Sequence, residues 1–245
     1  GSGSVQYRAT SPVLGLTWHV SDTWNLYANQ GKGFETPTLA EAAYTSNGAS
    51  VSGAFNTTLK AATSLHRELG TKWAPSPATH IGLAWFQIRT ENDLVADLST
   101  GGKTSYVNAT RTLRQGVELS AKHAWSPHWK SMASLTSMQA TYDQTYTTGA
   151  AGTPAGNRLP GVPDRLAFAS LQWAQTGFTP AGKQPRPGWE AGLDWVARSQ
   201  LWANDTNTAA AAGYGMLNAR IKQRFQWDRS AMEDYLGIDN LDNRS

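Results

Sequence analysis

The sequence alternates apolar and polar residues over long stretches. Between residues 217 and 227, apolar residues occupy the odd positions, broken only by Gln223. Arg220, Lys222 and Arg224 occupy even positions in the same stretch. A period of two over ten or more residues predicts a β-strand with one apolar and one polar face. Strands of soluble domains usually run about five or six residues, so these stretches favour strands that cross a membrane at a tilt.

Tryptophan gathers at the short turns that join these stretches. Trp18 and Trp24 flank one turn, and Trp125 and Trp129 flank another. Most of the 11 tryptophans lie near this one set of turns. Because an indole ring prefers the wet edge of a hydrocarbon layer, the pattern predicts an aromatic girdle at one membrane interface.

Ten strands are predicted, and the connections between them alternate in length. The predicted strands cover residues 11–20, 23–32, 65–74, 79–98, 104–126, 129–143, 164–175, 188–203, 214–227 and 231–239. The connections near residues 21, 76, 127 and 229 are short. The connection 176–187 falls at the same end as these short turns but is longer than they are. The others, 33–64, 99–103, 144–163 and 204–213, are mostly long. The predicted fold is all-β, an antiparallel transmembrane β-barrel with short periplasmic turns and long extracellular loops.

Composition argues against several other classes of protein. The chain has no run of about 18 apolar residues, as a helical span needs, and no cysteine for disulfides or thiolate sites. Its 21 basic residues are scattered and its formal net charge is +3, so no nucleic-acid partner is expected. A complete phosphate loop, a G-x-S-x-G elbow and an H-E-x-x-H motif are all missing. We therefore predict no enzyme activity, no cofactor and no metal site.

Five segments resemble the barrel of the TonB-dependent outer-membrane receptors, in the order in which that family carries them. The first contains Gly33-Phe34, Pro37 and Glu41, in the family's Gly-Phe-x-x-Pro-x-x-x-Glu pattern. The segments are 25–41, 59–70, 106–119, 159–163 and 239–241. Such receptors import ferric siderophores and similar metal chelates. The resemblance implies that extracellular loops capture the chelate and that the TonB complex supplies energy.

The resemblance also implies that the chain is part of a larger barrel. A family barrel has roughly 22 strands around a plugged lumen, whereas ten are predicted here. Nothing resembles the N-terminal plug or the TonB box, and the final strands are missing. Residues 1–245 are therefore expected to be a fragment of one transmembrane β-barrel domain. The TonB complex would act through the missing N-terminal region, and outer-membrane lipid and lipopolysaccharide would surround the wall.

Candidate ligand-binding residues lie in the long loops. Tyr44 and Phe55 belong to the longest loop and could stack on a flat chelate. Tyr146 and Arg158 lie in another loop, and arginine suits an anionic chelate. Ordinary loop packing and contact with lipopolysaccharide are alternative roles for all four. Two other classes also stay open: a passive outer-membrane porin or adhesin, and a soluble β-sandwich binding module.

Overall fold

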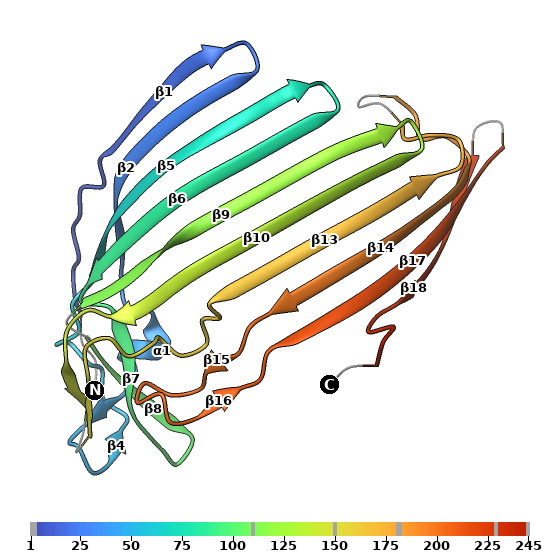
Figure 1. Cartoon of the computed structure of the whole chain (residues 1–245). Coiled ribbons are helices and arrows are strands. Elements are labelled where there is room, and N and C mark those ends of the chain that lie inside the picture. Colours follow the sequence, from blue (N-terminus) through green and yellow to red (C-terminus); the bar gives the residue numbers. More distant parts are fainter. Residues whose placement is uncertain (1–3, 109–110, 149–150, 180–182, 228–229, 244–245) are drawn as a thin grey trace.

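The chain folds into one curved antiparallel sheet of ten long strands (Figure 1). The computed structural model describes residues 4–108, 111–148, 151–179, 183–227 and 230–243. Each strand pairs with the long strands that precede and follow it in the chain. In sheet order the strands are β1 (Val13–Ser21), β2 (Trp24–Glu35), β5 (Ala62–Ser76), β6 (Thr79–Glu91), β9 (Arg111–Ser126), β10 (Trp129–Tyr142), β13 (Arg165–Ala174), β14 (Gly188–Arg198), β17 (Tyr214–Trp227) and β18 (Ser230–Ile238).

The prediction of ten long strands is confirmed. Because the long strands form a single sheet in the described part of the chain, the β-sandwich alternative is wrong.

Short elements fill the long loops at the other end of the sheet from the tight turns. They are α1 (Leu39–Ala42), β3 (Thr45–Ser46), β4 (Val51–Ser52), β7 (Leu94–Thr100), β8 (Lys103–Asn108), β11 (Tyr146–Thr148), β12 (Ala151–Thr153), β15 (Leu201–Trp202) and β16 (Ala210–Ala211). The eight short strands pair as four separate hairpins. None of the helices in the described ranges is long and apolar enough to cross a membrane.

Three predicted strands extend too far into the loops. The predicted strand 79–98 divides into β6 and β7, and 104–126 divides into β8 and β9. The main ladder stops at the pair Glu91↔Arg111, and Asn92 adopts a left-handed backbone with φ of 56°. This turn ends β6, and the chain then continues into the separate strand β7. Likewise the predicted strand 188–203 divides into β14 and β15.

The two faces of the sheet differ in polarity, as the period of two requires. Most of the exposed apolar side chains lie on the convex face, whereas the ion pairs of β14, β17 and β18 lie on the concave face. On the convex face Trp24 stands opposite Trp73, and Trp129 stands opposite Trp173. Trp24 and Trp73 are 41% and 46% exposed, so no protein layer from the described part of the chain covers them.

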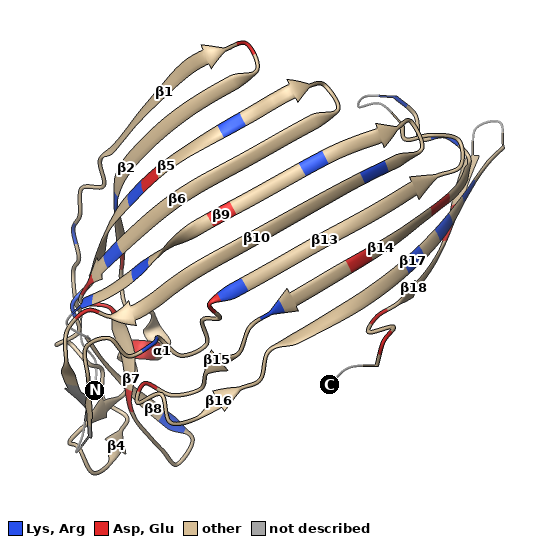
Figure 2. Cartoon of the chain, viewed as in Figure 1, with Lys and Arg blue, Asp and Glu red and all other residues tan. Residues whose placement is uncertain are grey.

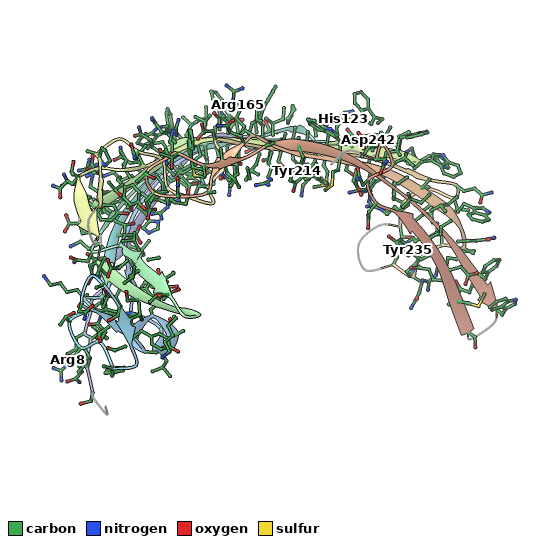
Figure 3. All side chains as sticks on the ribbon, turned by 90° about the horizontal axis from the view of Figure 1, so that it is seen from below. Arg8, His123, Arg165, Tyr214, Tyr235 and Asp242 are labelled. Carbon is green, nitrogen blue, oxygen red and sulfur yellow. The ribbon has the colours of Figure 1, made fainter. Side chains whose placement is uncertain are left out.

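A side view separates the convex and concave faces of the curved sheet (Figure 3). His123 and Arg165 lie on the convex side of the curved sheet, and Tyr214 and Tyr235 lie on the concave side. Strand register places the tryptophans of the short-turn end on the convex face, so the predicted girdle forms one row there: Trp18, Trp24, Trp73, Trp129, Trp173 and Trp189.

Candidate functional site: the concave wall and the loop platform

An ion-pair network crosses three strands of the concave face. Arg220 on β17 pairs with Asp194 on β14. Beside this pair, the Lys222 ammonium lies 3.3 Å from a Glu190 oxygen and 3.6 Å from a Glu233 oxygen. The alternation of β14, β17 and β18 sends all these side chains to one face. On this side of the lumen wall, the positive and negative charges therefore largely neutralise one another.

Tyrosine and glycine shape the other side of the concave wall. The Tyr27 hydroxyl donates a hydrogen bond to Glu68, and the Lys72 ammonium lies 5.3 Å from the Tyr27 ring centroid. The ring lies over Gly70, where an added Cβ would come within 2.6 Å of its atoms. Gly70 thus provides the space that lets Tyr27 lie flat along the wall.

The long loops pack together at the end of the sheet through a small apolar core, which we call the loop platform. Its members come from β7, from the end of β10 and from the loop that follows β10. They are Val95, Ala140, Tyr142, Tyr146 and Leu159, with Val107 and Val162 packed against them. The β7–β8 hairpin lies on the concave side of the sheet (Figure 3). The platform therefore lies at the mouth of the curved wall.

Tyr142 joins the platform to the loop between β14 and β17. Its hydroxyl donates a 2.6 Å hydrogen bond to Asp205, and the Asn157 amide donates to the Asp205 carbonyl oxygen at 2.9 Å. Burial, followed by the hydrogen bond to Asp205, raises the pKa of Tyr142 above its usual value. Burial also raises the pKa of Tyr146. The Tyr142 hydroxyl therefore keeps its proton, and its bond to Asp205, at alkaline pH where a free tyrosine ionises.

The loop between β2 and β5 packs on the same region from the other side. Its helix α1 begins at Thr38, whose hydroxyl and backbone N–H both donate to the Glu41 carboxylate. The helix and the β3–β4 hairpin contact β8. The Asn108 side chain bonds both the backbone N–H and the carbonyl oxygen of Lys60. The four long loops, which follow β2, β6, β10 and β14, thus form one connected surface.

The four predicted ligand-binding residues fall at three separate places. Tyr44 and Phe55 are half-buried in the β2–β5 loop, and the Lys103 ammonium lies 6.0 Å from the Tyr44 ring centroid. Tyr146 is 7% exposed and packs on Tyr142, with ring centroids 4.8 Å apart. Arg158 pairs with Asp164, Nη1 to Oδ1 at 3.0 Å. Tyr44 and Phe55 thus remain together only as members of one loop, and Tyr146 and Arg158 are held in local contacts.

Sequence reasoning missed the residues that connect the loops. Tyr142 and Asp205 are 63 positions apart, and Arg158 and Asn207 exchange two hydrogen bonds over a separation of 49. No local spacing or motif indicates such contacts. Asn207 does carry one local signal, since a left-handed backbone with φ of 54° favours asparagine.

Removal of the Tyr142 hydroxyl should loosen the loops without unfolding the wall. In Tyr142→Phe the Asp205 carboxylate loses a hydrogen bond worth about 1.5–3 kcal/mol. We expect amide exchange in residues 201–208 to become about tenfold faster or more, while β9 and β10 keep their protection. The matched control is Tyr106→Phe, because among the described residues the Tyr106 hydroxyl has no hydrogen-bond partner, and Asn56 bonds only its backbone carbonyl oxygen. Equal exchange in the wild type and Tyr142→Phe would contradict this role.

The described residues hold no group of three or more His, Asp or Glu side chains that could bind a metal ion. On the concave face, the acidic and basic side chains of β14, β17 and β18 instead pair with one another. Together, a single meander of long strands, an apolar convex face with a tryptophan girdle and a polar concave face define the wall of an outer-membrane β-barrel.

Comparison with known proteins identifies the family. Residues 1–241 match the family model described as TonB dependent receptor-like, beta-barrel. The chain therefore belongs to the TonB-dependent receptors, which reside in the bacterial outer membrane and are transporters rather than enzymes. Members of this family bind metal chelates and TonB.

Solved receptors share this fold at low sequence identity. BauA, the ferric preacinetobactin receptor of Acinetobacter baumannii, is 18% identical with a TM-score of 0.69, over 96% of this chain and 32% of BauA. FyuA, the ferric yersiniabactin uptake receptor of Yersinia pestis, is 20% identical with a TM-score of 0.67, over 95% and 32%. The copper transporter OprC is 18% identical with a TM-score of 0.70, over 96% and 34%. The chain thus spans about a third of the length of these receptors.

Proposed function

We propose that this chain supplies barrel wall and extracellular capture loops to a transporter that imports a ferric siderophore or a similar metal chelate with energy from TonB. Family membership supports the transporter class. The observation that carries the proposal is the loop platform, because it joins long loops from separate hairpins at the mouth of the concave wall. The family match argues against the passive porin or adhesin barrel, the other membrane class that the sequence left open. In this proposal the remaining strands, the plug and the TonB-contacting segment belong to a longer protein.

The aromatic pair Tyr44 and Phe55 is the first candidate for chelate contact in this proposal. Both lie in the β2–β5 loop, and Lys103 adds a positive charge beside Tyr44. An aromatic face and a cation suit a flat, anionic chelate. Tyr146 and Arg158 are the second pair, and direct contact by either requires that the loop after β10 moves out of its present packing.

Uptake by whole cells tests this proposal. Cells carrying the full-length receptor are given ferric citrate, a ferric catecholate, a ferric hydroxamate or Cu(II), with and without an active TonB complex. TonB-dependent uptake of at least one probe supports the transporter. Uptake of all probes at equal rates without TonB, together with channel conductance in planar bilayers, would establish the passive porin instead.

The double variant Tyr44→Ala/Phe55→Ala then tests the capture loop. We expect at least about tenfold weaker binding of the imported probe, because each lost aromatic contact is worth roughly 1 kcal/mol or more. Leu39→Ala is the control, since Leu39 lies in the same loop and is 83% exposed. Unchanged affinity in the double variant would remove these two residues from the proposed site and leave the transporter class standing.

A further inference from the structure

We propose that the concave wall carries a second anion-binding site, at the short-turn end of the lumen, which receives anionic cargo on its way out of the barrel. The site is a hollow of about 360 Å³ at the short-turn ends of β6, β9, β10 and β13. We call it the lysine hollow; its polar side chains on the concave face are His80, Lys122, Lys130 and Gln172. The inference rests on the proposed function for the identity of the cargo, and on the wall alone for the site.

Strand register places these side chains inside the lumen. Lys122 stands opposite His80, and it precedes His123, which lies on the convex side. Lys130 stands opposite Gln172 and directly follows Trp129 of the girdle. Because successive side chains of a strand point to opposite faces, both lysines face the lumen. Lys130 lies at the level of the tryptophan girdle, where the short turns reach the periplasmic interface.

The two lysines lie close enough to hold one anion between them. Lys122 stands opposite Met132, which is two residues from Lys130 on β10. Diagonal neighbours of this kind lie about 7–8 Å apart across an antiparallel pair, within the reach of two flexible ammonium arms. Their like charges repel each other. An anion between them relieves the repulsion and accepts hydrogen bonds from both.

The wall offers these lysines no carboxylate. Among the described residues, neither Lys122 nor Lys130 forms an ion pair. The same holds for Lys72, which precedes Trp73 on β5 and therefore also faces the lumen. The acid nearest to Lys122 along β9 is Glu118, about 13 Å away in an extended strand. The positive charge of this part of the wall is therefore left for another molecule to neutralise.

The neighbouring sector of the wall supplies its own counter-charges. Arg220 pairs with Asp194, and Lys222 lies beside Glu190 and Glu233. Figure 2 shows basic residues near the short-turn ends of β5, β9 and β10, and acidic and basic residues close together on β14 and β17. At the short-turn end of the described wall, the unpaired positive charge therefore gathers on one side of the lumen, over β5 to β10.

The lysine hollow suits a small anion with several oxygen acceptors. Its volume is that of a small-molecule pocket. The Lys130 ammonium lies 3.9 Å from the Phe178 ring centroid, a contact that positions the charge without neutralising it. The Gln172 amide donates one hydrogen to Ser170 at 3.1 Å and has a second hydrogen to donate. A chelate with carboxylate or other oxyanion groups matches this lining of donors, and a cleft lined by one sign of charge concentrates the opposite ion.

Acetylation of lysines in the full-length receptor tests the anion site directly. The purified receptor in detergent is treated with a water-soluble acetylating ester, with and without citrate, and the acetylation of each lysine is followed by mass spectrometry. We expect citrate to slow the acetylation of Lys122 and Lys130 about fivefold or more. The exposed lysines Lys60 and Lys183 should react at unchanged rates. Sodium chloride at the same ionic strength should protect neither pair.

Two acetylation results would overturn the site. Rapid reaction of Lys122 and Lys130 at the same rate with and without citrate would mean that no anion binds between them. Slow reaction already without citrate would mean that a part of the receptor itself occupies the lysine hollow. Because this assay needs no import, it decides the anion site even if the receptor transports none of the probes named above.

Uptake by whole cells tests the passage of cargo through the lysine hollow. The probe is the imported anion, ferric citrate or a ferric catecholate. We expect Lys122→Gln/Lys130→Gln to lower its maximal uptake rate about fivefold. Its affinity at the cell surface should not change, because the capture loops lie at the other end of the wall. Lys122→Arg/Lys130→Arg keeps both charges and should restore the rate. Lys183→Gln is the control, because it removes an exposed lysine from the same end of the sheet.

Wild-type uptake by Lys122→Gln/Lys130→Gln would refute the passage of cargo through the hollow. Import of Cu(II) alone would refute it too, since that cargo is a cation. If the double variant does not reach the outer membrane, Lys122→Gln replaces it, because the Lys122 side chain is exposed on the wall. About threefold slower uptake is expected there, and an unchanged rate would count against the proposal in the same way.

Discussion

Gly116→Val should prevent β9 and β10 from pairing in their present register. An added Cβ at this position would lie 2.3 Å from the Ser137 carbonyl oxygen and 2.9 Å from the Met138 Cα. Both are backbone atoms of the neighbouring strand, so no side-chain rotation relieves the contact. We expect a loss of roughly 3 kcal/mol or more in the free energy of unfolding, and poor recovery of folded receptor. Urea unfolding of the full-length receptor in detergent measures the loss in the free energy of unfolding.

Two other glycine variants show whether the backbone contact is the cause. Gly116→Ala introduces the same Cβ without the branch, and it should lose stability in the same direction by a smaller amount. Gly53→Val is the control, because nothing lies within 4 Å of a Cβ at Gly53 in its loop. A wild-type unfolding midpoint for Gly116→Val would contradict the expected clash.

Arg220→Met should destabilise the wall by about 1–2 kcal/mol, because the Asp194 carboxylate loses its cation, while the 39% exposed Arg220 side chain leaves the pair partly screened by water. The Asp194 side chain is 13% exposed, and in this variant its charge would have no cation beside it. Gly192 stands opposite Arg220, and a Cβ there would lie 3.0 Å from the Arg220 Nε. The strand thus leaves room for the guanidinium to reach Asp194.

The double variant Asp194→Leu/Arg220→Met separates the loss of the pair from the exposure of one charge. Replacing both partners by apolar residues of similar size is often close to neutral. We expect this variant to recover most of the stability lost in Arg220→Met, again by urea unfolding. If the double variant is as unstable as the single one, the ion pair itself stabilises the wall and the unpaired carboxylate is not the cause.

The sheet could be predicted from the sequence because its signals are local. The alternation in residues 217–227 fixes which side chains share a face of β17, and the tryptophans at the turns show where the strands reverse. The resemblance placed Gly116 in a family segment, and the structure adds the reason for glycine there: the backbone of β10 leaves no room for a side chain.

The loops could not be predicted in the same way. Five consecutive polar residues, 89–93, interrupt the alternation between β6 and β7, but they do not show at which of them the main ladder ends. The contact of Tyr142 with Asp205 depends on how two loops fold over the end of the sheet. Tyr146 is an aromatic residue in a polar loop, which is equally consistent with a ligand contact and with the packing seen here.

The order of the ten strands has a consequence for biogenesis. Every pairing in the large sheet joins long strands that follow one another in the chain, with only a turn or a loop between them. No pairing therefore waits for a distant long strand. Local pairings of this kind need little loop closure and form early. The wall can therefore grow one hairpin at a time, with the open edge of each completed hairpin serving as the template for the next.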